Sequence, residues 1–272
     1  SQTNAPIFKL PGNLQMAGFI FKLMRNKIRF HFRDLLAAED WNIGVISKPI
    51  EEVALVPGSL EKPAISWMQP GSRNIYLADP SGFIEDGKLH ILAEEYSYSG
   101  QKASISEIDP DGVSAPFRVI AGENHLSYPY IIVSRGEVYC LPESYQSRRV
   151  MLYRRDPATG RFAAEKIVLD NVEAVDPTLF FHDGFWWLFY TTKKHSTTHL
   201  YIWYATEMTG EYQPHCCNPV KIDVRSSRPA GTPFIHDGDL YRPAQDCSLT
   251  YGGRVIINKI IKLTVDEFAE QP

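Results

Sequence analysis

Acidic residues recur at matching positions in this sequence, counted from glycines that are typical of hairpin turns. Asp79 and Asp176 each precede a proline and stand eight residues before such a glycine. Glu94 and Glu143 each stand seven residues after one. Cleavage of a glycosidic bond needs two carboxyl groups in different protonation states, one acid and one base or nucleophile. The spacing therefore predicts chemistry on a sugar, with Asp79, Glu143 and Asp176 as the catalytic candidates.

Polar and aromatic residues occupy many of the equivalent positions elsewhere in the chain. Tyr128 and Ala230 stand where the two aspartates stand, and Thr191 and Gln245 stand where the two glutamates stand. Sugars bind to carboxylates, amides and hydroxyls through their own hydroxyl groups, and their rings stack on aromatic faces. The predicted substrate-binding residues are Glu94, His125, Tyr128, Thr191, Arg228, Arg242, Gln245 and Asp246.

Each carboxylate also has a purely structural interpretation. An Asp-Pro pair at a strand start often only satisfies nearby backbone N–H groups. The recurrence of Asp79 and Asp176 at one repeat position favours function. Glu94 and Glu95 are adjacent, so their side chains point to opposite faces of a strand and at most one reaches a central channel. Glu143 ends an otherwise apolar strand, where a carboxylate is either paired or functional.

The glycines themselves define an internal repeat. Gly87, Gly136, Gly184 and Gly238 are 49, 48 and 54 residues apart. Each follows Asp or Arg between apolar runs, which is a strong hairpin signal because glycine tolerates a positive φ. A further β-like stretch follows each hairpin, at residues 103–108, 150–154, 200–205 and 255–260. Three to four strands in about 50 residues are typical of a β-propeller blade.

The number of blades depends on the N-terminal residues. Four repeats occupy about 76–268, and Trp41 to Ile46 supplies a strand for a fifth. We therefore predict an all-β, five-bladed propeller over 41–272, closed by its N- and C-terminal segments, with an arm or helix at 1–40. A four-bladed propeller with an N-terminal extension is the alternative. Because each hairpin is antiparallel, the polar positions should gather at the end opposite the turns, around a central funnel.

Composition narrows the range of partners. The net charge of −4 gives no basic face for nucleic acid. The four cysteines form no CxxC pair and no spacing typical of zinc, so we predict no metal and no cofactor. Free thiols indicate a reducing compartment, so we expect a cytoplasmic protein. No run of 18 apolar residues would span a membrane.

One basic stretch departs from the β pattern. Residues 19–33 contain five Lys or Arg and no acid, interleaved with large apolar residues. Such a stretch forms an amphipathic helix that either lies on a membrane surface or packs its apolar side on the domain, and we favour the packed arrangement.

These motifs resemble known families. An Asp-Pro strand, an Asp-Gly turn and a period near 50 resemble the five-bladed glycoside hydrolases of the arabinanase and invertase type. Residues 41–268 more closely resemble the propeller domain of plant glucosamine inositolphosphorylceramide transferases and bacterial relatives, some of which are joined to formyltransferase-like domains. The strings that carry this similarity are Trp41 to Val45, Ala78 to Pro80, His125 to Pro129, Pro142 to Ser144, Val175 to Pro177, Arg228 to Gly231, Arg242 to Cys247 and Tyr251 to Gly253.

The resemblance implies a carbohydrate context with altered catalytic residues. In the arabinanase pattern, a first-blade Asp is the base, a second-blade Asp tunes the acid, and a third-blade Glu is the acid. Asp79 matches the base, but Tyr128 and Asp176 replace the other two. An enzyme acting by hydrolysis or transfer would use Glu143 as its acid and Asp176 to orient substrate or tune that acid.

A second hypothesis is a non-catalytic module that binds a glycan and supports a glycosyltransferase or formyltransferase partner domain. The altered residues favour it, whereas a polar rim suits both hypotheses. A protein-docking scaffold would show exposed apolar patches instead.

Two arginines bear on the charge of the ligand. Arg228 and Arg242 flank the small residues Ala230 and Gly231. If both are free, they form a positive wall that suits an acidic sugar or a sugar phosphate. If each pairs with a neighbour such as Asp246 or Glu143, they only brace the rim.

Overall fold

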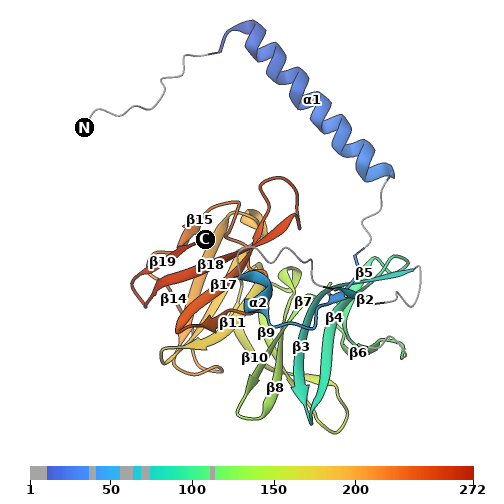
Figure 1. Ribbon diagram of the computed structural model, residues 1–272, viewed down its shortest axis with the longest axis vertical. Coiled ribbons are helices and arrows are strands. Elements are labelled where there is room, and N and C mark those ends of the chain that lie inside the picture. Colours follow the sequence, from blue (N-terminus) through green and yellow to red (C-terminus); the bar gives the residue numbers. More distant parts are fainter. Residues whose placement is uncertain (1–10, 37–40, 56–63, 69–73, 111–113) are drawn as a thin grey trace. The chain divides into compact units, whose positions relative to one another are not determined.

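Alternating apolar strands and glycine turns fold this chain into four antiparallel sheets that follow one another in sequence (Figure 1). The computed structural model describes residues 11–36, 41–55, 64–68, 74–110 and 114–272. The chain divides into two units, Ser1–Asp40 and Trp41–Pro272. In the first unit the described structure is the helix α1 (Asn13–Leu36). The second unit holds all the strands.

Each sheet pairs its first four strands in chain order, as propeller blades do, and in the third sheet the additional strand β15 pairs with β13. The first contains β3 (Ile75–Glu85), β4 (Lys88–Ser97), β5 (Lys102–Ile108) and β6 (Phe117–Ile120). The second contains β7 (Ser127–Ser134), β8 (Glu137–Glu143), β9 (Arg149–Arg155) and β10 (Phe162–Asp170). The third contains β11 (Ala174–His182), β12 (Phe185–Thr192), β13 (His199–Ala205), β14 (Gln213–Pro214) and β15 (Lys221–Ile222). The fourth contains β16 (Phe234–His236), β17 (Asp239–Asp246), β18 (Arg254–Leu263) and β19 (Phe268–Gln271).

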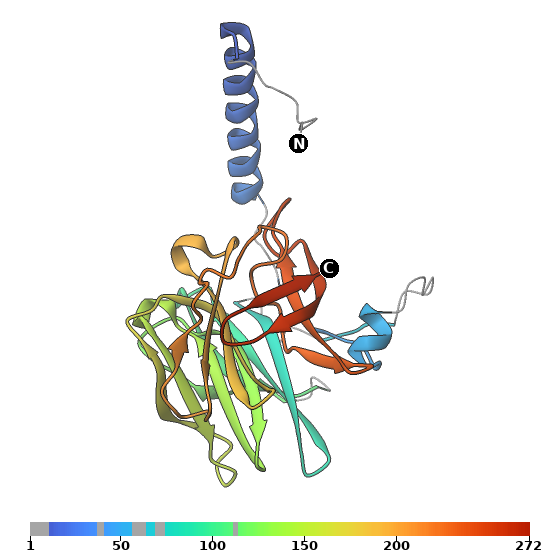
Figure 2. The same cartoon turned by 90° about the vertical axis from the view of Figure 1, so that its left-hand side faces the viewer.

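Short elements complete the second unit. Two 3-10 turns, η1 (Tyr145–Ser147) and η2 (Lys193–His195), follow the second strands of blades two and three. Near the N-terminal end, β1 (Gly44–Val45) pairs with β2 (Ser66–Trp67), and the helix α2 (Ile50–Ala54) lies between them in sequence. Figures 1 and 2 place α2 beside the last sheet, where it lines a groove with β17 and β18.

The all-β propeller prediction is confirmed, but five complete blades are not present among the described residues. The expected strand at Trp41 to Ile46 forms only the two-residue β1, which pairs with β2. The last sheet takes its strands from β16 to β19, so a last blade shared by both termini does not describe this sheet. A two-residue strand offers too few ladder hydrogen bonds to support a blade.

The four inner hairpins turn where the sequence predicts. In each, the residue before the turn glycine and the glycine itself both have positive φ, as at Asp86 (50°) and Gly87 (75°). This geometry is the type I′ turn, whose twist matches that of the flanking strands. The remaining three turns are centred on Gly136, Gly184 and Gly238.

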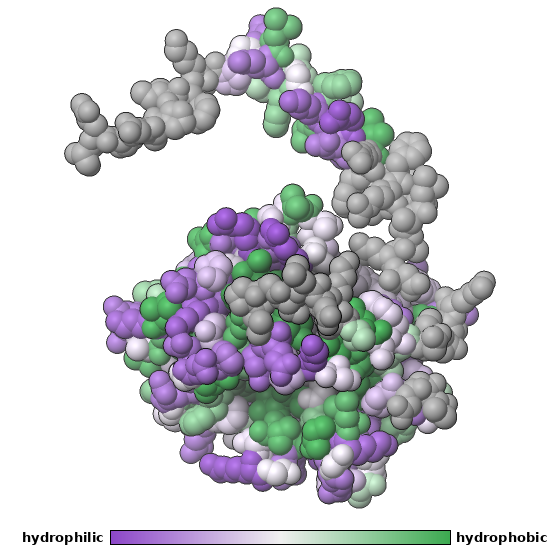
Figure 3. Space-filling model, viewed as in Figure 1, coloured by the Kyte–Doolittle hydropathy of each residue, from purple (hydrophilic) through white to green (hydrophobic). Residues whose placement is uncertain are grey.

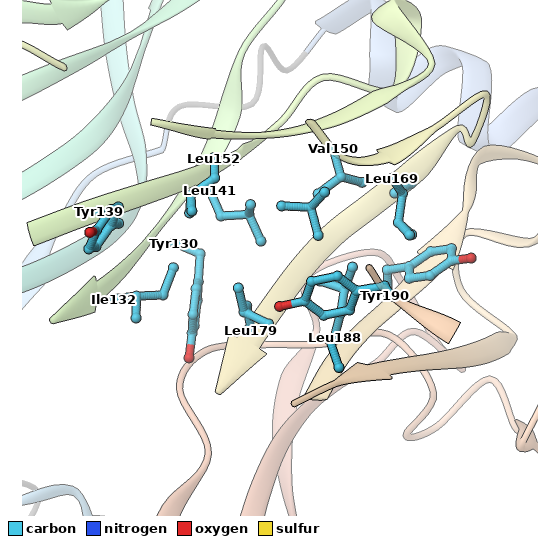
Figure 4. Packing of buried hydrophobic residues seen from close by; sticks show 14 residues of the cluster. Tyr130, Ile132, Tyr139, Leu141, Val150, Leu152, Leu169, Leu179, Leu188 and Tyr190 are labelled. Atoms are coloured by element: carbon cyan, nitrogen blue, oxygen red, sulfur yellow. The ribbon is translucent and has the colours of Figure 1, made fainter. Parts of the chain in front are cut away.

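Apolar side chains from neighbouring sheets pack between the blades. Figure 4 shows this packing between the second and third sheets, where Leu141 and Leu152 contribute to one cluster with Leu179 and Leu188. A similar cluster joins the first and second sheets, and another joins the third and fourth. The blades are therefore held by burial of apolar surface, which leaves their polar strand ends available for a site.

Leu152 provides a test of this packing. Its side chain has no exposed surface, so Leu152→Ala should lower the free energy of unfolding by about 2–5 kcal/mol, through lost burial and the cavity it leaves. Equilibrium urea unfolding measures the change. Ile84→Ala is the matched control, because Ile84 is 64% exposed and surface changes stay within about 0.5 kcal/mol. Equal effects at both positions would contradict the packing.

Candidate functional site

A backbone irregularity marks the site in the first three sheets. The register shifts between Ala78 and Ser81 on β3, and equivalent shifts occur on β7 and β11. Each shift contains a residue before proline with a left-handed φ, namely Asp79 (50°), Tyr128 (44°) and Asp176 (50°). Such a φ is uncommon outside glycine. Residues held in this way cluster at functional sites, so the repetition favours function.

The predicted partners lie opposite these irregularities. Glu94 pairs with Ala78, the neighbour of Asp79. Glu143 pairs with Ser127, and Thr191 pairs with Val175. The sequence placed the aspartates at the starts of their strands, whereas Asp79 lies five residues into β3. The bulge, rather than the strand end, turns these residues out of the regular ladder.

A buried ion pair occupies the middle of the site. Asp176 is 2% exposed. Its carboxylate accepts hydrogen bonds from Arg228 Nε at 2.6 Å and Nη2 at 3.3 Å. Gln245 Nε2 donates to the same carboxylate at 2.8 Å. The guanidinium also lies over the ring of Tyr251, 5.0 Å from its centroid. Asp176 is therefore held by three donors, and Arg228 is neutralised by it.

Glu143 depends on the same aspartate. It is buried, and the backbone N–H of Asp176 donates to Glu143 Oε2 at 2.9 Å. Burial and the nearby Asp176 carboxylate raise the pKa of Glu143 well above its ordinary value, although Arg228 opposes the shift. Glu143 consequently favours the protonated form, as a general acid must.

Asp79 differs because the residue is exposed, although protein surrounds its carboxyl on most sides. Loss of hydration in the surrounding protein is the largest cause of its pKa shift. The nearby carboxylates of Asp176 and Glu94 add to it, and together these causes raise the pKa of Asp79 to about 7. Arg228 and a hydrogen bond from the backbone of Tyr128 oppose this shift. Its exposure makes Asp79 the catalytic candidate that a ligand can reach.

Glu94 lies beside a group of tyrosines that the sequence analysis missed. Its Oε1 is 3.3 Å from His125 Nε2 and 3.5 Å from the hydroxyl of Tyr76. Tyr76 stacks on Tyr96 at 4.8 Å, and Tyr98 meets both edge-on. The signal was present, because Glu94 and Tyr96 alternate on β4 and therefore share a face, and Tyr98 follows at the same spacing just after the strand ends. We call Tyr76, Tyr96 and Tyr98 the tyrosine cluster.

Tyr128 crosses between blades. Its hydroxyl accepts a hydrogen bond from the backbone N–H of Gly231 at 2.9 Å and lies 3.0 Å from Thr178 Oγ1. Burial raises the pKa of Tyr128 well above its ordinary value. The hydroxyl predicted to bind substrate is therefore engaged in linking the second, third and fourth repeats.

Arg242 is not part of a substrate site. It is 1% exposed and donates to Glu270 Oε2 at 2.8 Å and to the backbone oxygen of Ser226 at 2.6 Å. The sequence left open whether the two arginines were free or paired. Both are paired, Arg228 with Asp176 and Arg242 with Glu270. The hypothesis that two free arginines form a positive wall for an anionic sugar is therefore wrong.

Thr191 and Asp246 are also engaged elsewhere. The buried Thr191 hydroxyl donates to the backbone oxygen of Ser196 at 2.9 Å. Asp246 accepts from Arg254 Nε at 2.7 Å and from the backbone of Ser248 at 2.9 Å. Hydrogen bonds from Ser248 and then Arg254 lower the pKa of Asp246 to about 2. These partners, not a ligand, account for both residues.

Within the described ranges, one cluster has metal-ligand chemistry, namely His215, Cys216 and Cys217. His215 uses both ring nitrogens, because Nδ1 accepts from the backbone of Cys217 at 3.1 Å and Nε2 lies 3.0 Å from the Thr264 carbonyl. The histidine is thus an anchor for the turn. The two thiols lie 3.6 Å apart.

Comparisons with known proteins agree with this architecture. Residues 63–272 match the model of the family described as glucosamine inositolphosphorylceramide transferase 1, N-terminal. The chain is 34% identical to the rice (japonica) glucosamine inositolphosphorylceramide transferase 1 and 32% identical to the Arabidopsis thaliana protein. These matches cover 72% and 75% of the chain. The chain spans only 28% of the length of either relative.

A solved structure is similar in fold. An exo-β-1,3-galactanase from Clostridium thermocellum matches with a TM-score of 0.58, covering 75% of this chain and 52% of that one. Its sequence identity is 11%, so the likeness concerns the propeller fold alone.

Removing the buried cation should destabilise the site. Arg228→Met leaves the Asp176 carboxylate buried without its charged partner, which should cost about 3–5 kcal/mol in unfolding free energy at neutral pH. Urea unfolding at neutral pH measures the loss. Arg149→Met is the matched control, because the side chains of Arg149 and its partner Asp170 are 53% and 67% exposed, and such an exposed pair should contribute about 1 kcal/mol or less.

The raised pKa of Asp79 gives a second prediction. Its carboxyl carbon should titrate near pH 7 in an NMR experiment on aspartate-labelled protein, and Asp79→Asn should remove that signal. The folded state holds this proton more tightly than the unfolded chain. The stabilisation is therefore complete below about pH 4 and is lost as pH rises through about 7, relative to Asp79→Asn. A midpoint near 4 would reject the crowded carboxylate arrangement.

Proposed function

Because the chain belongs to the glucosamine inositolphosphorylceramide transferase 1 N-terminal family, we propose that its propeller is a glycan-binding module that holds a sugar without cleaving it. One observation carries the proposal. Of the three residues predicted to be catalytic, only Asp79 is exposed, whereas Glu143 and Asp176 are buried. Asp176 is occupied by Arg228 and Gln245, and Glu143 is buried behind the Asp176 backbone. A cleaving site needs two carboxyl groups that both reach the substrate.

The binding surface combines Asp79 with Glu94 and the tyrosine cluster. The Asp79 carboxylate accepts hydrogen bonds from sugar hydroxyls that approach from the solvent. Glu94 is held between His125 and Tyr76, so its orientation is fixed before a ligand arrives. The partly exposed rings of Tyr96 and Tyr98 offer an apolar face next to these acceptors, which is how proteins hold the C–H face of a sugar ring.

The ligand of this surface is neutral or cationic rather than acidic. The carboxylates Asp79, Glu94 and Asp176 influence one another, and Arg228 already pairs with one of them. A carboxylate or phosphate brought next to Asp79 would be repelled. This reverses the preference that two free arginines would have given.

The module would serve a catalytic domain elsewhere. The chain corresponds to 28% of the curated relatives, whose names describe them as transferases. We place the propeller as the part that presents a glycan acceptor to a glycosyltransferase or formyltransferase partner domain, on the same chain or another one. An added binding site raises the local concentration of acceptor near such a domain.

Hydrolysis or transfer by the propeller itself is the second candidate. The observation that favours it is the presence of two carboxyl groups with raised pKa values, Asp79 at about 7 and Glu143 well above its ordinary value. A carboxyl that favours the protonated form can act as the acid while one that is partly ionised near neutral pH acts as the base, which is the combination that glycoside cleavage needs.

A glycan array followed by product analysis tests the proposal. Asp79→Ala should weaken binding of the best ligand at least about tenfold, because a charge-assisted hydrogen bond contributes about 1.5–3 kcal/mol. Tyr98→Ala should weaken it by a smaller factor. Asp183→Ala is the matched control at the opposite, turn end of a blade, and it should bind as the wild type does.

Two results would contradict the module. Turnover of a bound glycan that Asp79→Asn and Glu143→Gln each abolish would establish the enzyme instead. Binding that survives both Asp79→Ala and Tyr98→Ala would place the ligand outside this surface.

A further inference from the structure

The helix α1 exposes an unusual amount of apolar surface. Eight large apolar residues between Leu14 and Ile28 are 42% to 91% exposed. Figure 3 shows hydrophobic and hydrophilic residues reaching the surface together along this helix. Exposed apolar area on this scale favours a partner that removes it from water.

The apolar residues form a stripe. Met16, Ile20, Met24 and Ile28 are spaced by four residues, which places them along one side of the helix. Phe21 lies next to this stripe. All five are at least 42% exposed, so the whole stripe is available to a partner.

The other side of the helix carries positive charge. Lys22 and Arg25 are three residues apart and share a face away from the stripe. Lys27 is four residues after Leu23 and three after Met24, so it lies within the apolar side, where its long stem lets the ammonium reach outward. The sequence contains no acidic residue from Ser1 through Arg33. The polar groups that border the stripe are therefore cationic or neutral.

We propose that α1 lies in the plane of an anionic lipid bilayer, with its apolar stripe among the acyl chains and its cations against the headgroups. The charge pattern selects this occupant. A helix in the membrane plane meets anionic headgroups along its polar side, where Lys22 and Arg25 lie, and the long stem of Lys27 lets its ammonium reach them as well. A second copy of α1 would instead bring Lys27 against Lys27.

The helix rests on the surface and does not cross the bilayer. No helix in the described part of the chain is long and apolar enough to span a membrane. Lys22, Arg25 and Lys27 interrupt the middle of α1, and burying them at the bilayer centre is costly. This interaction does not depend on the glycan-binding proposal, because it uses none of its residues.

Vesicle sedimentation of the full chain tests the interaction. The protein should sediment with phosphatidylcholine vesicles that contain phosphatidylserine and much less with phosphatidylcholine alone, and high salt should weaken binding. Each cation near such a surface contributes a factor of about five, so Lys22→Gln with Arg25→Gln should weaken binding about 30-fold. Ile20→Ser with Met24→Ser should remove the apolar anchor and abolish sedimentation.

Matched controls sit on the propeller. Lys48→Gln with Lys88→Gln removes two exposed cations, and Ile84→Ser with Ile235→Ser changes two exposed apolar residues. Both pairs should sediment as the wild type does. Absence of sedimentation by wild-type protein whose helix is intact by circular dichroism would overturn the proposal. Equal binding to both vesicle types would also overturn it. A dimer detected by light scattering would overturn it as well, if Ile20→Ser with Met24→Ser dissociates that dimer and the control pairs do not.

Discussion

The ion pair between Asp176 and Arg228 is the interaction on which the rest of the site depends. Taking both charges out of water is costly, and only close contact with further hydrogen bonds offsets that cost. Gln245 supplies one such bond from β17, which ties the third repeat to the fourth. The backbone N–H of the same aspartate holds Glu143 of the second blade. In the first blade, burial is the largest cause of the raised pKa of Asp79, and the charge of Asp176 adds to it. One buried carboxylate therefore interacts with polar groups of all four repeats.

The strained residues before proline explain how that carboxylate reaches the centre. In a regular strand, side chains point alternately to the two faces of the sheet and pack between blades. The left-handed φ at Asp79, Tyr128 and Asp176 breaks this alternation within a bulge. The strain is tolerated because the flanking strands are paired on both sides of each bulge. The fourth repeat uses Gly231 at a φ of 130°, which costs glycine little.

Sequence patterns could predict the fold and the gathering of the site because both follow from local signals. The Asp-Gly and Arg-Gly turns fixed each hairpin register, and register placed Glu94 and Glu143 opposite the bulges. The partner of Arg242 could not be predicted, since Glu270 lies on the outermost strand and is brought close only by the complete sheet. A fifth blade was predicted from a β-like run at Trp41, but such a run carries no information about whether neighbouring strands exist to pair with it. The tyrosine cluster was missed although alternation along β4 contained it.

The replacements in the second and fourth repeats decide where a ligand can approach. Tyr128 reaches from the second blade to Gly231 and Thr178, so its ring and hydroxyl fill space that a shorter aspartate would leave open. Arg228 and Gln245 close the same region from the fourth repeat around Asp176. In the first blade, by contrast, Asp79 is an exposed residue, and the tyrosine cluster belongs to the same blade. The polar centre is thus closed by side chains around Asp176 and exposed at Asp79. Such an arrangement can orient a sugar on the first blade at little entropic cost, whereas it keeps the buried acid away from the bond that it would have to protonate.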